Sequence, residues 1–176
     1  MPERIEITKM KQNSENREYV IENVKQEGAL LEFASEELRD DKEVVLEAIH
    51  NNAEALEFAS DRLKGDRQVV YDSVSKAGWT YCYAQENLLE DKELLMSGLK
   101  VTGQILYFAA PKMRDDWEVV KEAVKNKPII IKYASGRLRE DKEIGITAMK
   151  VNKNCYEFLG PKLKQDEDIL KIKNGE

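Results

Sequence analysis

Apolar residues recur along the chain at intervals of three and four, which is the spacing of one side of a helix. Residues 54–78 show the pattern clearly. The apolar residues that form the pattern in this segment are Ala55, Leu56, Phe58, Ala59, Leu63, Val69, Val70 and Val74. The spacing predicts two short helices, one in each half of this segment.

The same pattern returns every 25 residues without insertion or deletion. One series is always aromatic: Phe33, Phe58, Tyr83, Phe108, Tyr133 and Phe158. A second series is always aspartate: Asp41, Asp66, Asp91, Asp116, Asp141 and Asp166. Six units extend from residue 29 to the end, and residues 16–28 match the second half of one more. A constant period of this size is typical of stacked repeats.

The sequence therefore predicts an all-α fold, an α-solenoid of stacked 25-residue two-helix repeats over residues 16–176. Residues 1–15 match no unit, so we expect either an N-terminal extension or cap, with Ile5 and Ile7 packed against the stack, or a disordered segment. Helices this short do not persist alone, so neighbouring repeats must supply the core. We expect the aromatic series to lie in that core.

The recurring aspartate is expected to cap the second helix of each repeat. Its carboxylate can accept hydrogen bonds from the unpaired N–H groups of the first turn. A neighbouring register, with Asp40 as the cap and Glu43 three residues later, would form a capping box instead. The sequence leaves both registers open. The first helix is expected to end after about seven residues, before a short turn that carries a recurring leucine.

The segments Leu31–Val45 and Leu56–Val70 share one motif, LxFASxxL followed by a basic residue and xDxxVV. This motif resembles the repeat family known as domain of unknown function 4116, and the likeness covers nearly the whole chain. The resemblance implies a helical repeat module. It implies no activity and no catalytic residues.

Composition narrows the classes of function. Apolar residues make up 41% and charged residues 35%, a balance typical of folded chains rather than disordered ones. The net charge of −6 argues against a dedicated nucleic-acid binder. No apolar run approaches the roughly 20 residues of a membrane span, and residues 1–10 lack the apolar stretch of a signal peptide. We therefore expect a cytoplasmic protein without membrane contact.

Candidate catalytic chemistry is sparse. The single histidine, His50, falls in a repeat position that otherwise holds Ser75 or lysine, so we expect it to face solvent. The recurring serines follow the aromatic-alanine pair and are better explained as helix caps than as nucleophiles. One histidine and two cysteines form no zinc-binding motif. The sequence therefore predicts no enzyme activity, no metal and no cofactor.

Candidate binding residues are those that break the repeat. Tyr107 and Trp117 occupy positions that are charged in most other units, so we expect them to be exposed and available to a partner. Arg114, Arg137 and Arg139 lie in two basic positions of the turn between helices, and stacking would align them in a ridge. Gly145 occupies a position that holds a core residue in the other units, which is consistent either with a bend in the stack or with no structural effect.

Charge is unevenly distributed along the chain. Residues 1–103 carry 13 Lys and Arg against 22 Asp and Glu, whereas residues 104–176 carry 15 against 12. The favoured interpretation is a non-catalytic protein-binding module that acts as an adaptor, a scaffold or a stoichiometric inhibitor. The alternative is contact with nucleic acid or an acidic partner through the basic repeats at 104–153. A merely solvated edge is also consistent, since acidic residues follow the basic ones.

Overall fold

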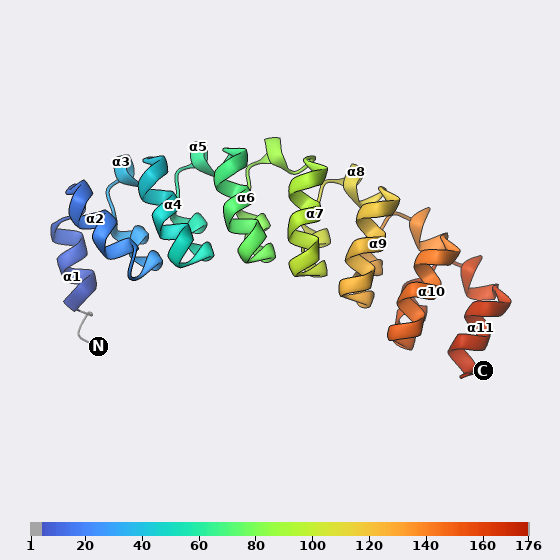
Figure 1. The fold of residues 1–176 in the computed structure, drawn as a ribbon. Coiled ribbons are helices and arrows are strands. Elements are labelled where there is room, and N and C mark those ends of the chain that lie inside the picture. Colours follow the sequence, from blue (N-terminus) through green and yellow to red (C-terminus); the bar gives the residue numbers. More distant parts are fainter. Residues whose placement is uncertain (1–4, 176) are drawn as a thin grey trace. The chain divides into compact units, whose positions relative to one another are not determined.

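The computed structural model describes residues 5–175, and within that range every regular element is a helix (Figure 1). The chain divides into two compact units, residues 1–88 (unit 1) and residues 89–176 (unit 2). Both are built from 25-residue helical repeats. The predicted all-α repeat fold is confirmed.

Unit 1 contains six α-helices and four 3-10 helices within the described residues. The α-helices are α1 (Ile5–Gln12), α2 (Arg17–Val24), α3 (Glu36–Arg39), α4 (Lys42–Asn51), α5 (Asp61–Lys64) and α6 (Arg67–Lys76). The 3-10 helices are η1 (Gly28–Phe33), η2 (Ala53–Phe58), η3 (Gly78–Tyr83) and η4 (Glu86–Leu88). Helix α4 packs between α2 and α6, and η2 packs between η1 and η3 (Figure 1).

Unit 2 continues the same order of elements. Its α-helices are α7 (Lys92–Val101), α8 (Pro111–Arg114), α9 (Trp117–Asn126), α10 (Lys142–Val151) and α11 (Glu167–Asn174). Its 3-10 helices are η5 (Gly103–Tyr107), η6 (Pro128–Tyr133), η7 (Leu138–Glu140), η8 (Lys153–Phe158) and η9 (Leu163–Gln165). Helix α9 packs between α7 and α10, and η6 packs between η5 and η8.

Each repeat thus contributes one 3-10 helix and one long α-helix, joined by a single turn of helix. In each unit, successive repeats form a row of 3-10 helices and a row of α-helices. The two helices predicted in each repeat are both present, and the first one is a 3-10 helix of five or six residues. Its backbone hydrogen bonds therefore join residues three apart rather than four apart.

The recurring aspartates cap the ten-residue α-helices, as the first of the two registers predicted. Asp41 Oδ1 accepts hydrogen bonds from the backbone N–H groups of Glu43 at 2.9 Å and Val44 at 3.3 Å. Asp66 makes the same pair of bonds. Asp40 is the C-cap of α3 instead, so the alternative register is wrong.

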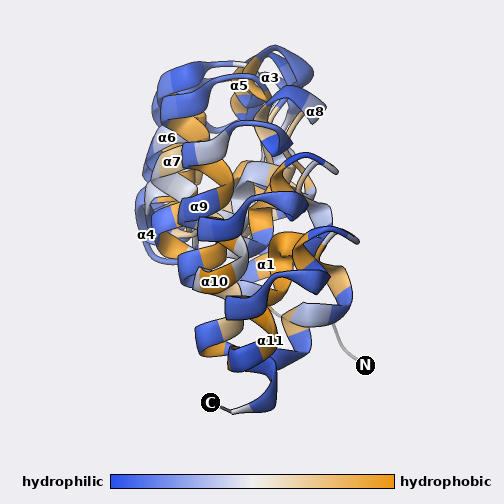
Figure 2. Ribbon diagram, turned by 90° about the vertical axis from the view of Figure 1, so that its right-hand side faces the viewer, coloured by the Kyte–Doolittle hydropathy of each residue, from blue (hydrophilic) through white to orange (hydrophobic). Residues whose placement is uncertain are grey.

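The core lies between the two rows of helices. Fully buried aliphatic side chains such as Val44, Leu56, Val69, Leu106 and Ile131 fill it. In α10 the hydrophobic residues gather on one side of the helix and hydrophilic residues on the other (Figure 2). This is the amphipathic pattern that the spacing of apolar residues predicts.

The aromatic series does not lie in the core, contrary to expectation. Phe33, Phe58, Tyr83, Tyr133 and Phe158 are half-buried, and Phe108 is exposed. A 3-10 helix has three residues per turn, so positions i and i+3 lie above one another. In each repeat this places the aromatic side chain at the border between the buried and the exposed side of the 3-10 helix. One aromatic ring per repeat is therefore partly accessible.

Residues 5–12 form helix α1, which packs against η1. Met10 is fully buried and anchors this helix, whereas Ile5 is 68% exposed. The expectation that Ile5 packs against the stack is therefore wrong. Ile7 is half-buried in the same helix, and residues 1–4 fall outside the described residues.

A polar ladder connects successive repeats along the row of α-helices. Within each unit, the first residue of a long helix reaches the capping aspartate of the next repeat, 24 residues later. In unit 1, Arg17 Nε lies 2.7 Å from Asp41 Oδ2, and Lys42 Nζ lies 2.7 Å from Asp66 Oδ2. In unit 2, Lys92 Nζ lies 2.8 Å from Asp116 Oδ2. Each aspartate is thus both a helix cap and an acceptor for the preceding repeat.

A second link connects the turns. Asp115 accepts hydrogen bonds from Ser135 Oγ and from Arg137 Nε, the latter at 3.2 Å. These two bonds hold the pKa of the Asp115 carboxyl below its usual range. Ser135 Oγ also accepts a bond from Leu138 N–H, so the serine caps the next turn as predicted.

Candidate functional site

An exposed cluster of aromatic rings lies on the row of 3-10 helices in unit 2. Tyr107 is 55% exposed and Phe108 is 44% exposed. The Tyr107 ring meets the Phe108 ring at 5.0 Å and the Tyr133 ring at 4.9 Å between centroids, both edge to face. Tyr107 ends η5 and Tyr133 ends η6, so the packing of these two helices assembles the cluster.

The cluster borders an open groove of about 370 Å³. Lys127 and Lys132 lie at this groove, together with Ile129. The Lys132 ammonium sits 4.8 Å from the centroid of the Tyr133 ring. We call this surface the basic aromatic face; it consists of Tyr107, Phe108, Lys127, Ile129, Lys132 and Tyr133. It combines accessible apolar area with positive charge.

The corresponding surface of unit 1 is mainly acidic, with a cation, the Lys11 ammonium, 5.2 Å from the centroid of the Phe33 ring. Its exposed positions are Glu32, Glu54 and Glu57, next to the half-buried rings of Phe33 and Phe58. We call these five residues the acidic face. Glu54 and Glu57 are three residues apart in η2, so both point to the same side of that helix.

Glu57 is also held by its neighbour. Its Oε2 accepts a hydrogen bond from the Tyr83 hydroxyl at 2.9 Å. Burial, followed by this bond to a carboxylate, raises the pKa of Tyr83. A groove of about 480 Å³ beside Phe58 has Glu36, Glu57 and Asp61 among its lining residues. Arg39 and Lys64 also line this groove, so its three carboxylates stand beside two cations.

The arginines of the predicted basic ridge differ in whether they form an ion pair. Arg137 pairs with Asp115, and its guanidinium also donates to the Asp115 carbonyl at 2.6 Å. Arg114 and Arg139 pair with no acidic side chain among the described residues, and their Nε atoms are buried without a hydrogen-bond partner there. Of these three arginines, Arg137 therefore connects two repeats, whereas Arg114 and Arg139 form no ion pair among the described residues.

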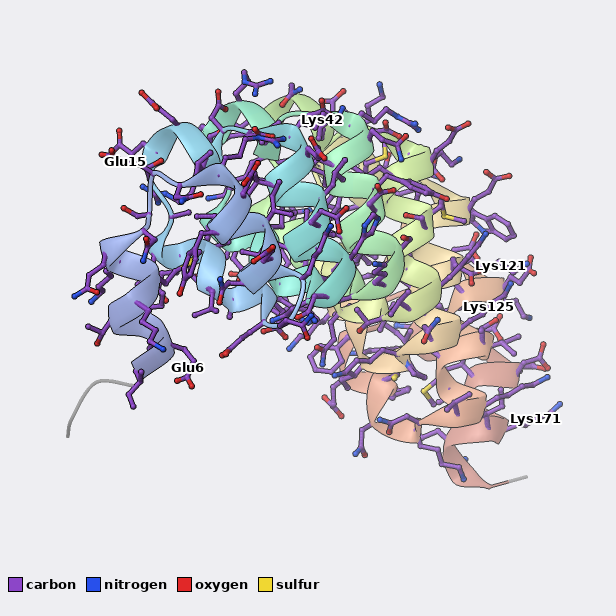
Figure 3. All side chains as sticks on the ribbon, turned by 60° about the vertical axis from the view of Figure 1, so that its left-hand side comes forward. Glu6, Glu15, Lys42, Lys121, Lys125 and Lys171 are labelled. Carbon is purple, nitrogen blue, oxygen red and sulfur yellow. The ribbon has the colours of Figure 1, made fainter. Side chains whose placement is uncertain are left out.

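Trp117 is half-buried, so the expectation of an exposed side chain is wrong. Its indole Nε1 donates to Asp141 Oδ2 at 3.2 Å, as a step of the polar ladder. Lys121 Nζ lies 4.3 Å from the centroid of the indole and 2.6 Å from Glu143 Oε1. Lys121 and Lys125 extend outward from α9 in Figure 3. Tyr107 and Trp117 thus lie on different rows of helices.

The sequence matches the family model described as domain of unknown function (DUF4116) twice, at residues 16–64 and 116–164. These matches cover more than half of the chain. The chain belongs to this family. The first DUF4116 match lies in unit 1 and the second in unit 2, and they begin 100 residues apart, which is four repeat lengths of 25. No curated protein and no solved structure shows significant similarity to the chain.

The residues considered for catalysis are helix caps or solvent-exposed side chains. Ser35, Ser60 and Ser135 cap short helices, as expected, and His50 is exposed at the end of α4. Burial raises the pKa of the Cys155 thiol, which disfavours the reactive thiolate. Within residues 5–175 no three His, Cys, Asp or Glu side chains gather in a metal-binding cluster, and no helix there is long and apolar enough to cross a bilayer.

Sequence reasoning found Tyr107 but missed its neighbours in this DUF4116 chain. Phe108 and Tyr133 belong to the aromatic series, and their recurrence pointed to the core. The available signal was the adjacent position in the repeat, which is charged in four of the six units, as Glu32, Glu57, Lys132 and Glu157. Charged residues next to the aromatic series indicate that its side chains lie at the border between the buried and the exposed side of the short helix.

Proposed function

We propose that the chain is a cytoplasmic protein-binding module without catalytic activity, and that the basic aromatic face is its binding surface. The observation that supports this proposal is the exposed edge-to-face cluster of Tyr107, Phe108 and Tyr133 beside Lys127 and Lys132. Aromatic rings bury much area at little cost in conformational entropy, which is why binding hot spots use them.

The two lysines define the chemistry of the partner. Neither Lys127 nor Lys132 pairs with an acidic side chain among the described residues, so their charge is available to a ligand. A protein segment with an apolar anchor for the ring cluster and flanking carboxylates for the lysines would satisfy both features. Electrostatic attraction of this kind speeds encounter and selects among partners. The module would act by occupying such a segment, as an adaptor, a scaffold or an inhibitor does.

A displayed library of random peptides tests this proposal. We expect selection on the immobilised chain to enrich peptides that carry an aromatic residue or leucine next to aspartate or glutamate. Calorimetry on the enriched peptides should show binding about tenfold weaker for Tyr107→Ala and for Lys132→Glu. Lys171→Glu is the matched control, because it makes the same charge change on α11, and Lys171 does not line this groove.

Two outcomes would count against a protein partner. One is a selection that enriches no peptide, or peptides that bind the Tyr107→Ala chain equally well. The other is tight binding of DNA or RNA that weakens steeply as salt rises, which would favour a nucleic-acid contact through residues 104–153. Arg114 and Arg139, whose Nε atoms have no hydrogen-bond partner among the described residues, are the reason to measure nucleic-acid binding alongside peptide binding.

A further inference from the structure

The two units carry surfaces of opposite charge at equivalent positions of the repeat. Unit 1 has 11 Lys and Arg against 19 Asp and Glu, a net charge of −8, and unit 2 has 17 against 15, a net charge of +2. The contrast is sharpest on the row of 3-10 helices. Glu32 and Glu57 occupy the position that Tyr107 and Lys132 occupy in unit 2, and Phe33 and Phe58 match Phe108 and Tyr133.

We infer that the acidic face of unit 1 docks on the basic aromatic face of unit 2 of a second copy of this chain. This inference rests on the proposed function, because it names one occupant of the surface proposed there. The acidic face offers what that surface selects, namely carboxylates next to aromatic rings. Glu32 and Glu54 have no ion-pair partner among the described residues, so their charge is available.

The shared repeat also matches the two faces in spacing. Both are built from consecutive 3-10 helices that pack side by side, η1 with η2 in unit 1 and η5 with η6 in unit 2. When one repeat of the acidic face meets one repeat of the basic aromatic face, the next pair of repeats therefore comes into register. Rings would then meet rings along both repeats, and glutamates would meet the two lysines at η6.

Charge reversal tests this pairing with residues that the chain itself uses. Glu32→Lys with Glu57→Lys introduces the lysine found at position 132, and Lys132→Glu with Lys127→Glu introduces the glutamates found at positions 32 and 27. These exchanges suit the local backbone for that reason. Glu22→Lys on α2 and Lys171→Glu on α11 are matched controls, because both side chains are exposed on α-helices.

Light scattering after size-exclusion chromatography measures the outcome. We expect the natural chain to associate at low salt and to dissociate at moderate salt, where exposed charges are screened beyond about 10 Å. Each double reversal should weaken self-association at least about tenfold, and the controls should leave it unchanged. A 1:1 mixture of the two double variants should associate again, since one has two basic faces and the other two acidic faces. The chain with all four reversals should also self-associate.

Two results would overturn the inference. A natural chain that stays monomeric at low salt is one, and a natural chain that associates while the 1:1 mixture does not is the other. Circular dichroism of every variant confirms that the helices are retained. The peptide experiment separates the two proposals: enriched acidic peptides that bind a strictly monomeric chain would leave the protein-binding function standing and remove only the second copy as its partner.

Discussion

The indole N–H of Trp117 donates to the capping carboxylate of Asp141 at 3.2 Å, in the step of the ladder where a cation stands in the other described repeats. Lys142 makes the corresponding contact with Asp166 at 3.0 Å. A neutral donor has replaced an ammonium group, and the ring brings a packing surface that Lys121 covers at 4.3 Å. Trp117 therefore connects α9 to the start of α10.

Trp117→Lys should preserve the stability of the chain, because lysine is the usual residue at this step. We expect the free energy of unfolding to change by less than about 0.5 kcal/mol. Trp117→Ala removes the indole hydrogen bond and the cation–π contact, so it should cost about 1–2 kcal/mol. Urea unfolding of the two variants measures both values. Equal losses for lysine and alanine would contradict a role of Trp117 in the ladder.

Asp66 combines a helix cap with an ion pair, and two substitutions separate these contributions. Asp66→Asn keeps a side-chain oxygen that can cap α6 but loses the charge that pairs with Lys42, so it should cost about 0.2–1 kcal/mol. Asp66→Ala loses the cap as well and should cost about 1 kcal/mol more.

Lys42→Ala is the control for the ion pair alone. Its loss in stability, from chemical unfolding, should match that of Asp66→Asn. A loss as large as that of Asp66→Ala would show that the lysine contributes by packing rather than by pairing with the aspartate.

Asp115 should make stability depend on pH. Its bonds to Ser135 and Arg137 lower its pKa in the folded chain, below the ordinary value of about 3.9 in the unfolded chain. The stabilisation is therefore present above that ordinary value and is lost as the pH falls through the folded pKa. We expect Asp115→Asn to be less stable than the natural chain at neutral pH, with the difference shrinking as the pH falls below about 4.

Thermal unfolding over a series of pH values gives the comparison. Arg137→Gln removes one of the two bonds and should show a smaller change of the same sign. Curves for the natural chain and Asp115→Asn that run parallel down to acid pH would be inconsistent with this prediction.

Gly160 makes room for a cap that comes from the preceding repeat. Glu140 accepts hydrogen bonds from the backbone N–H groups of Leu163 at 2.8 Å and Lys162 at 3.3 Å. A Cβ at Gly160 would overlap the Glu140 carboxyl group. Gly160→Ala should therefore displace this cap and cost about 1 kcal/mol.

Gly136→Ala is the matched control, because a Cβ at Gly136 meets nothing within 4 Å. That variant should be neutral or up to about 1 kcal/mol more stable. The double variant Gly160→Ala with Glu140→Ala should cost no more than the larger single loss, since both changes remove one cap. Additive losses in urea unfolding would contradict a shared cap.

Sequence patterns predicted the fold because each local signal has one dominant physical cause. The recurring aspartate follows from unpaired N–H groups at a helix start, and the recurring serine has the same cause. The type of the first helix was not predictable in this way, because five or six residues support either hydrogen-bond pattern. Gly145 shows the same limit. A Cβ there would crowd the buried Leu163 side chain, and this contact between repeats leaves no local sequence signal.

The candidate site divides along the same line. Tyr107 stood out in the sequence because it breaks a charged series, and its exposure is confirmed. Trp117 breaks a similar series, yet only the tertiary structure revealed Asp141 as its partner, 24 residues away. The sequence by itself determined the repeat, the two possible registers of the caps and the charge difference between the two parts of the chain, because these depend on residue type and spacing. The packing of one repeat on the next decided which aromatic rings remain accessible and which cations remain unpaired, because both depend on side chains that the neighbouring repeat supplies.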